Sequence, residues 1–167
     1  MHPFRKAVEN RDHAAIEALL AEDVVFTSPV AFRPYPGKAI TAAILRGVIR
    51  VFTDFRYVRE IGSEDGRDHA LVFTAKVGDM EINGCDFLHF DEQGKIDDFM
   101  VMVRPLSAAQ ALAAAMGAQF DRIKEEALAA ATAGDAISGD TTAGDATAGD
   151  VSPEGARTEG ARAEGER

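Results

Sequence analysis

Asp86 is the one charged residue on an otherwise apolar face of a predicted β-strand, residues 80–90. Successive side chains of a strand point to opposite faces, so Asp86 shares its face with apolar residues and one glycine. These are Met80, Ile82, Gly84, Leu88 and Phe90. A carboxylate in such surroundings either pairs with a donor or an arginine, or has its pKa raised by desolvation. A pKa raised to near neutral pH would make Asp86 an effective general acid and base.

The strands expected at residues 69–77 and 95–104 extend this apolar face on both sides of Asp86. The same alternation predicts which of their side chains point toward it. The first strand offers Leu71, Phe73, Ala75 and Val77, and the second offers Phe99, Val101 and Val103. We therefore expect four apolar side chains to line a substrate site around Asp86: Phe73, Leu88, Phe99 and Val101.

Three polar side chains elsewhere in the chain are candidates for orienting the oxygens of a substrate: Ser28, Tyr35 and Tyr57. Each also has a structural interpretation, which we prefer. Ser28 would cap the turn that follows it, and Tyr35 would brace a proline-rich loop. Tyr57 would pack in the sheet with its hydroxyl at the rim.

A structural interpretation is open for Asp86 as well. Buried carboxylates also occur in ion pairs, and Arg56 or Arg104 would be the partner here. Cys85 is the single cysteine, and it has no second cysteine or nearby histidine pair with which to form a zinc site. We expect a reduced, buried thiol, no metal and no cofactor.

The overall composition is that of a globular protein with an acidic surface. The chain has 167 residues, of which 46% are hydrophobic and 28% are charged, and its formal net charge is -10. Nucleic acids and anionic membranes both require a basic face, so neither is an expected partner. The N-terminal stretch carries charges throughout and shows no uninterrupted apolar run. We therefore expect neither a signal peptide nor a membrane span, and a cytoplasmic protein.

The elements that must position these residues follow from hydrophobic periodicity and turn signals. Two short helices within residues 4–20 precede a strand at residues 24–28, a stiff proline-rich loop, and a helix at about residues 37–53. Four strand-like segments with glycine-containing hairpin turns follow, at residues 55–61, 69–77, 80–90 and 95–104. A last helix is expected at about residues 107–131. This order predicts an α+β fold with a mostly antiparallel sheet.

From residue 132 onward the composition changes to Gly, Ala, Asp, Thr, Glu and Arg, with a five-residue period. Such a tract cannot bury enough apolar surface to offset the entropy of ordering it. We therefore expect one domain over residues 1–131, followed by a disordered, low-complexity acidic tail at residues 132–167.

Two stretches of the sequence resemble a known superfamily. They are Ala21-Glu22-Asp23-Val24-Val25-Phe26 and Cys85-Asp86-Phe87-Leu88-His89-Phe90-Asp91-Glu92-Gln93-Gly94-Lys95-Ile96. With the order of elements, they resemble the nuclear transport factor two-like superfamily, and within it the SnoaL-like and ketosteroid isomerase-like branch, over about residues 3–105. The resemblance implies a cone-shaped α+β barrel, in which a curved, mostly antiparallel sheet wraps around helices and encloses an apolar pocket. It does not imply one function, because this superfamily includes isomerases, cyclases, dehydratases, hydrolases and binding modules.

The isomerase pattern of this branch fits the chain only at Asp86, which matches the pocket acid that donates to a dienolate oxygen. Ser28 stands where the pattern has a proton-shuttling aspartate, and Phe4 stands where it has an oxyanion-hole tyrosine. Ketosteroid isomerase activity itself is therefore not expected. In SnoaL-like polyketide cyclases, an aspartate at this strand position is the general acid and base of ring closure.

Two functions follow as hypotheses. In the first, the protein binds a small hydrophobic or aromatic molecule, and Asp86 catalyses its cyclisation or isomerisation without a cofactor. In the second, it is a non-catalytic module that binds such a molecule or forms dimers, which the scarcity of catalytic groups favours. A second polar side chain within hydrogen-bond reach of Asp86 would favour the first.

The opposite face of the same strands is expected to be apolar as well. Phe87, His89, Met100 and Met102 fall on it, and these side chains would be exposed in a monomer. In this superfamily the outer face commonly pairs two subunits, so the resemblance implies a homodimer.

Overall fold

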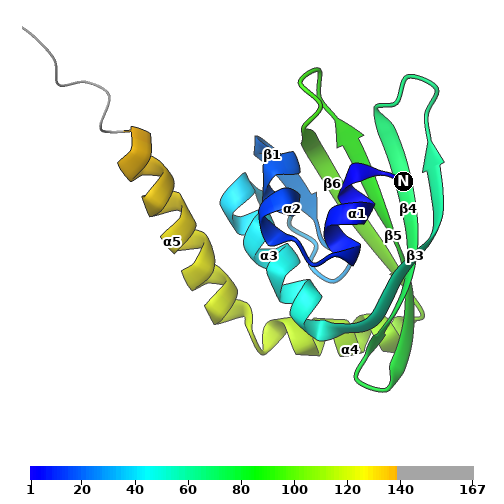
Figure 1. The fold of residues 1–167 in the computed structure, drawn as a ribbon. Coiled ribbons are helices and arrows are strands. Elements are labelled where there is room, and N and C mark those ends of the chain that lie inside the picture. The colour runs from blue at the N-terminus through cyan, green and yellow to red at the C-terminus, as the bar shows by residue number, and fades with distance from the viewer. Residues whose placement is uncertain (139–167) are drawn as a thin grey trace, which may run out of the picture.

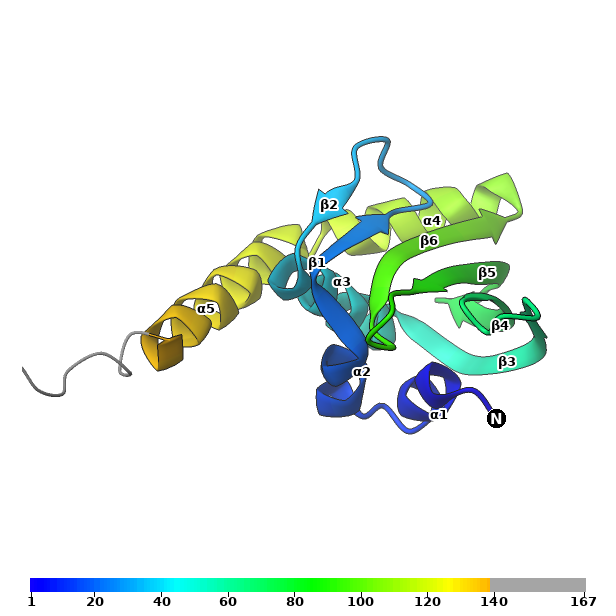
Figure 2. The ribbon, with the colours of Figure 1, turned by 90° about the horizontal axis from the view of Figure 1, so that it is seen from above.

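A curved, unclosed sheet forms one wall of the molecule (Figures 1 and 2). In this computed structural model, which describes residues 1–138, six strands follow the order β2-β1-β6-β5-β4-β3. They are β1 (Leu20–Thr27), β2 (Tyr35–Pro36), β3 (Phe52–Gly62), β4 (Asp68–Val77), β5 (Met80–Phe90) and β6 (Ile96–Arg104). The neighbouring strands β1 and β6 are parallel, and every other neighbouring pair is antiparallel.

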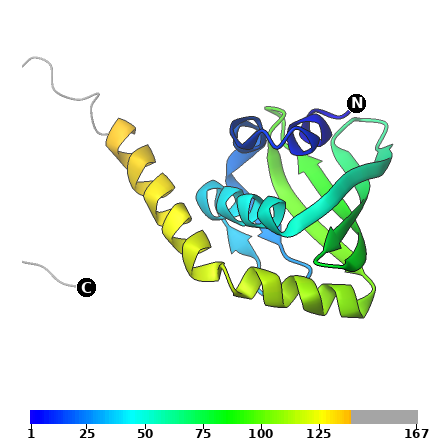
Figure 3. The same cartoon turned by 60° about the horizontal axis from the view of Figure 1, so that its bottom comes forward.

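Five helices accompany the sheet within the described residues, and three of them lie on its concave side. These three are α1 (Pro3–Glu9), α2 (His13–Leu19) and α3 (Lys38–Val51). Helix α4 (Leu106–Gly117) crosses one end of the cone, and α5 (Phe120–Ser138) packs on α3 and then extends away from the sheet (Figure 3). The curved sheet wrapped around helices confirms the predicted α+β cone.

The hairpins of the sheet form at the positions where the sequence carries turn residues. Gly66, Gly78 and Gly94 adopt positive φ angles of 71°, 59° and 73° in the three connections between β3 and β6. Glycine adopts this region without the steric cost that a Cβ imposes. These turns fix the strand register, and with it the set of side chains that points toward the helices.

The C-terminal helix differs from its predicted form. The sequence predicts one helix at about residues 107–131, but two helices are present, and they meet at an elbow at residues 118–119. Gly117 lowers helix propensity at this point. The Gln119 side chain donates to the backbone oxygen of Gly47 on α3, at 3.1 Å, so a tertiary contact fixes the change of direction.

Two boundaries also differ from the predicted ones. Strand β1 begins at Leu20, directly after α2, rather than at residue 24, and the proline-rich loop contains the short strand β2. Helix α5 reaches Ser138, which is seven residues beyond the predicted end of the domain at residue 131. The rest of the predicted tail, residues 139–167, lies outside the described residues. Within residues 1–138, none of the helices combines the length and hydropathy needed to cross a membrane.

Candidate functional site

A cavity of about 320 Å³ lies between the concave face of the sheet and the helices. This volume is at the lower end of the range of about 300–1,000 Å³ that is usual for small-molecule sites. Aromatic side chains from helices and strands form much of its wall: Phe4, Phe26, Phe52, Phe55, Phe73, Phe99 and Phe120. The cavity is thus suited to a compact apolar molecule of a few rings.

Asp86 lines this cavity from the inner face of β5. Its neighbours across the sheet are Leu71 on β4 and Val101 on β6, and only 6% of its surface is exposed. Burial raises the pKa of Asp86 to about 7, and the hydrogen bond from Tyr57 partly counteracts that rise. At neutral pH the carboxyl group is therefore poised between its acid and base forms.

Tyr57 on β3 is the polar partner of Asp86. Its hydroxyl donates a hydrogen bond to Asp86 Oδ2, with 2.5 Å between the two oxygens, and the tyrosine is 4% exposed. Burial and the charge of Asp86 hold the pKa of Tyr57 well above its ordinary value, so the hydroxyl keeps its proton and remains the donor. The sequence predicts a Tyr57 hydroxyl at the rim of the sheet, whereas the hydroxyl lies in the interior.

The strand register explains how Tyr57 reaches Asp86 across β4. Tyr57 lies opposite Phe73, and Phe73 lies opposite Gly84, two residues before Asp86. A Cβ at Gly84 would overlap the Phe73 ring, so the missing side chain lets that ring lie against the backbone of β5. The Tyr57 ring packs edge-on against Phe73 and also against Phe55, at centroid distances of 6.3 and 4.9 Å.

The ion-pair interpretation of Asp86 does not hold. Arg56 and Arg104 are both exposed, and no salt bridge or second hydrogen bond to the Asp86 side chain occurs among residues 1–138. The other carboxylate oxygen, Oδ1, therefore has no partner within the described chain. A ligand oxygen or an acidic C–H group in the cavity would meet this atom.

The remaining predicted residues lie around the same cavity, with one exception. Ser28 and Tyr35 both line it, and Ser28 Oγ also accepts from the backbone N–H of Val30, at 3.2 Å, as a turn cap does. The Tyr35 ring packs between Phe26 and Phe120. The apolar residues Phe73, Phe99 and Val101 form part of the wall. Leu88 is buried in the core opposite Phe99 and is not part of the wall.

Several wall residues were not predicted from the sequence. Phe55 was identifiable, because it alternates with Tyr57 along β3 and so shares its face. Glu9 at the end of α1, Arg11 in the turn that follows, and Met116 on α4 also line the cavity. No local pattern indicates these three, because their place in the wall depends on how helices pack on the sheet.

The side chain of His89 lies away from the cavity. His89 contacts Asp97 on the outer side of the sheet, with 2.6 Å between Nδ1 and Oδ1, and this hydrogen bond raises the pKa of His89. Within residues 1–138, no group of three or more His, Cys, Asp and Glu side chains is arranged to hold a metal ion.

A match to a protein-family model shows which family the chain belongs to. The model described as a SnoaL-like domain matches residues 2–99, which is more than half of the chain. The chain is a SnoaL-like protein. The matched residues include both Asp86 and Tyr57, so the polar pair belongs to the SnoaL-like domain itself. No curated protein matches the chain.

Solved structures agree with this family. A steroid delta-isomerase from Pseudomonas aeruginosa is 43% identical, with a TM-score of 0.68, over 71% of this SnoaL-like chain and 87% of the isomerase. A protein with a cystatin-like fold from Silicibacter pomeroyi is 38% identical, with a TM-score of 0.67, over 74% and 91% of the two chains. A putative SnoaL-like polyketide cyclase from Shewanella denitrificans shares the fold at 16% identity and a TM-score of 0.50, over 70% and 93%. The predicted membership of the SnoaL-like and ketosteroid isomerase-like branch is confirmed.

Proposed function

We propose that this protein binds a small hydrophobic or aromatic carbonyl compound in the cavity, and that Asp86 moves a proton on it without a cofactor. The observation that carries the proposal is the buried Tyr57–Asp86 hydrogen bond at the wall of an apolar cavity. It provides a second polar side chain within hydrogen-bond reach of Asp86, which favours acid/base chemistry. The name of the isomerase from Pseudomonas aeruginosa supports proton transfer as the class of reaction.

The chemistry follows from the two forms of Asp86. The ionised carboxylate accepts a proton from the carbon next to a carbonyl group, which leaves an enolate. Return of that proton to another carbon of the substrate gives isomerisation. Attack of the enolate carbon on a second carbonyl, with the proton delivered to the new alkoxide, gives ring closure. Tyr57 keeps its proton throughout and holds the carboxyl group in place.

The reaction class can be tested without knowing the natural substrate. We expect wild type to accelerate exchange of the α-protons of 2-tetralone in deuterium oxide, followed by proton NMR. Asp86→Asn removes the base and should reduce this rate at least about 100-fold. Tyr57→Phe removes the donor that lowers the pKa of Asp86, so the pH midpoint of its activity should move upward.

Asp98→Asn is the matched control, since Asp98 lies on the next strand and is exposed. Exchange at the wild-type rate in Asp86→Asn would refute the catalytic role. Binding of 2-tetralone without any exchange would favour the alternative function, a non-catalytic binding or dimerisation module. The Tyr57–Asp86 hydrogen bond also supports that alternative. The Tyr57 hydroxyl donates its proton to Asp86, so it does not donate to an oxygen of the substrate.

A further inference from the structure

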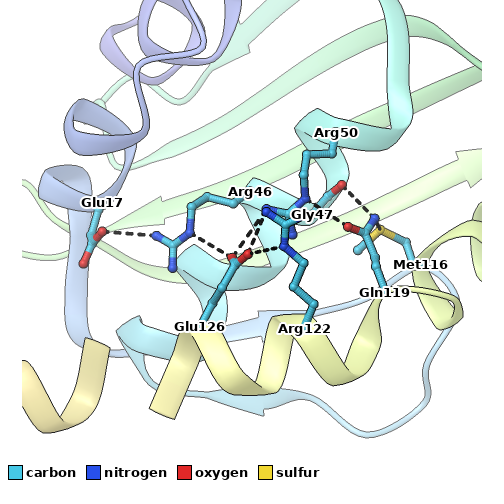
Figure 4. Close-up of polar contacts among 8 residues, drawn as sticks. All are labelled: Glu17, Arg46, Gly47, Arg50, Met116, Gln119, Arg122 and Glu126. Atoms are coloured by element: carbon cyan, nitrogen blue, oxygen red, sulfur yellow. Dashed lines mark hydrogen bonds and ion pairs between the residues drawn. The ribbon is translucent and has the colours of Figure 1, made fainter. Parts of the chain in front are cut away.

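Glu126 on α5 accepts hydrogen bonds from three arginines (Figure 4). Arg46 and Arg50 reach it from α3, at 3.3 and 3.1 Å, and Arg122 reaches it from the preceding turn of α5, at 2.9 Å. Arg46 also contacts Glu17 on α2, at 3.4 Å. One carboxylate therefore joins α5 to α3 and, through Arg46, to α2.

The same two helices touch closely at a second point, Gly47. Gln119 donates to the Gly47 backbone oxygen and accepts from Arg50 Nε, at 3.0 Å (Figure 4). A Cβ at Gly47 would lie 2.9 Å from Ile123 Cδ1, so the missing side chain permits this approach. Together these contacts hold the start of α5 in one position on α3.

This anchored segment carries part of the cavity wall. Met116 and Phe120 line the cavity and flank Gln119, whose amide nitrogen lies 3.7 Å from Met116 Sδ. The Phe120 ring also packs against the Tyr35 ring, with 6.1 Å between the ring centroids. Any shift of α5 on α3 would therefore move Phe120, the first residue of α5, relative to the cavity.

The segment also lies outside the part of the chain that the family model matches, residues 2–99. The matched part supplies Asp86 and Tyr57, whereas the elbow between α4 and α5 supplies the wall at Met116 and Phe120. Part of the cavity wall is therefore supplied from outside the matched residues.

We infer that Met116 and Phe120 set the largest ligand that the cavity admits, and that Glu126 is a positioning residue that acts through Phe120. Removing the Glu126 charge leaves Arg50 without its carboxylate partner and leaves Arg46 with Glu17 alone. The attachment of α5 to α3 is then weaker, and the wall at Phe120 becomes less well defined. This inference rests on the proposed function, because it assumes that the cavity binds an apolar molecule that carries an oxygen.

The test compares two fluorescent phenols of different size, 2-naphthol with two rings and 1-hydroxypyrene with four. Dissociation constants for both are measured by fluorescence titration, and the ratio of the two constants is the readout. Phe120→Ala should shift this ratio about tenfold in favour of 1-hydroxypyrene, because it removes a ring from the wall. Glu126→Gln should shift the ratio in the same direction, although its side chain does not touch the ligand. Glu125→Gln, an exposed neighbour on α5, should leave the ratio unchanged.

A ratio equal to that of wild type in either Phe120→Ala or Glu126→Gln would overturn the inference. Should Glu126→Gln fail to fold, Arg50→Gln, which removes a donor that reaches the same carboxylate from α3, takes its place under the same criterion. Asp86→Asn distinguishes the two proposals. If neither phenol binds to wild type, the proposed function fails. If both phenols bind to wild type, Asp86→Asn weakens their binding, and the ratio is the same in every variant, only this inference fails.

Discussion

At the scale of single residues, Asp86 costs stability in its ionised form. It is buried among apolar side chains, and no cation reaches it from within residues 1–138. Desolvation therefore favours the protonated carboxyl group, while the Tyr57 hydrogen bond favours the carboxylate. Desolvation is the larger effect, so the pKa of Asp86 rises to about 7. A group with this pKa exchanges protons readily at neutral pH.

The pH dependence of stability tests this balance. Because the folded state holds the Asp86 proton more tightly than the unfolded state, its stabilising contribution is complete below a pH of about 4 and is lost as the pH rises through the folded pKa of about 7. Relative to Asp86→Asn, the free energy of unfolding of wild type should fall by roughly 4 kcal/mol over that interval and change no further above it. Urea denaturation between about pH 4 and pH 8 measures this difference. Parallel curves for the two proteins would contradict the raised pKa.

At the scale of the elements, the packing of β4 on β5 depends on Gly84. The Phe73 ring occupies the space that a side chain at Gly84 would need. We expect Gly84→Ala to destabilise the protein by about 1–3 kcal/mol, because the ring must move and Phe73 is fully packed. Gly117→Ala is the control: a Cβ there meets no atom within 4 Å, so equal or slightly higher stability is expected from helix propensity. Thermal denaturation of both variants measures these changes in stability. A Gly84→Ala protein as stable as wild type would contradict the close packing of Phe73 on Gly84.

At the scale of the whole molecule, the outer face of the sheet leads to a prediction about assembly. Phe87 and Met102 are 37% and 55% exposed there, and they lie on the adjacent strands β5 and β6. The homodimer implied by the family resemblance would cover them. We expect wild type to sediment as a dimer and Phe87→Lys as a monomer in analytical ultracentrifugation. Phe32→Lys, which changes a fully exposed phenylalanine outside the sheet, should remain a dimer, and a monomeric wild type would refute the prediction.

The order of elements, the inner face of β5 and the burial of Asp86 were all predictable from the sequence. Two-residue alternation along β5 and the glycines of the turns are local signals, and the sheet follows them. The direction of the Tyr57 hydroxyl was not predictable in this way. One strand, β4, separates the two residues of that contact, and the contact depends on the register of three strands and on the packing of Phe73 against Gly84.

By itself, the sequence thus determined the order of elements and the carboxylate that faces the interior, because periodicity and turn residues act over a few positions, and its resemblance to the SnoaL-like branch implied the cone. Tertiary structure alone decided that Tyr57 rather than an arginine bonds to Asp86. It also decided that the last helix breaks at residues 118–119 to bring Phe120 into the cavity wall. Both outcomes depend on contacts between residues far apart in the chain, and no local pattern encodes such contacts.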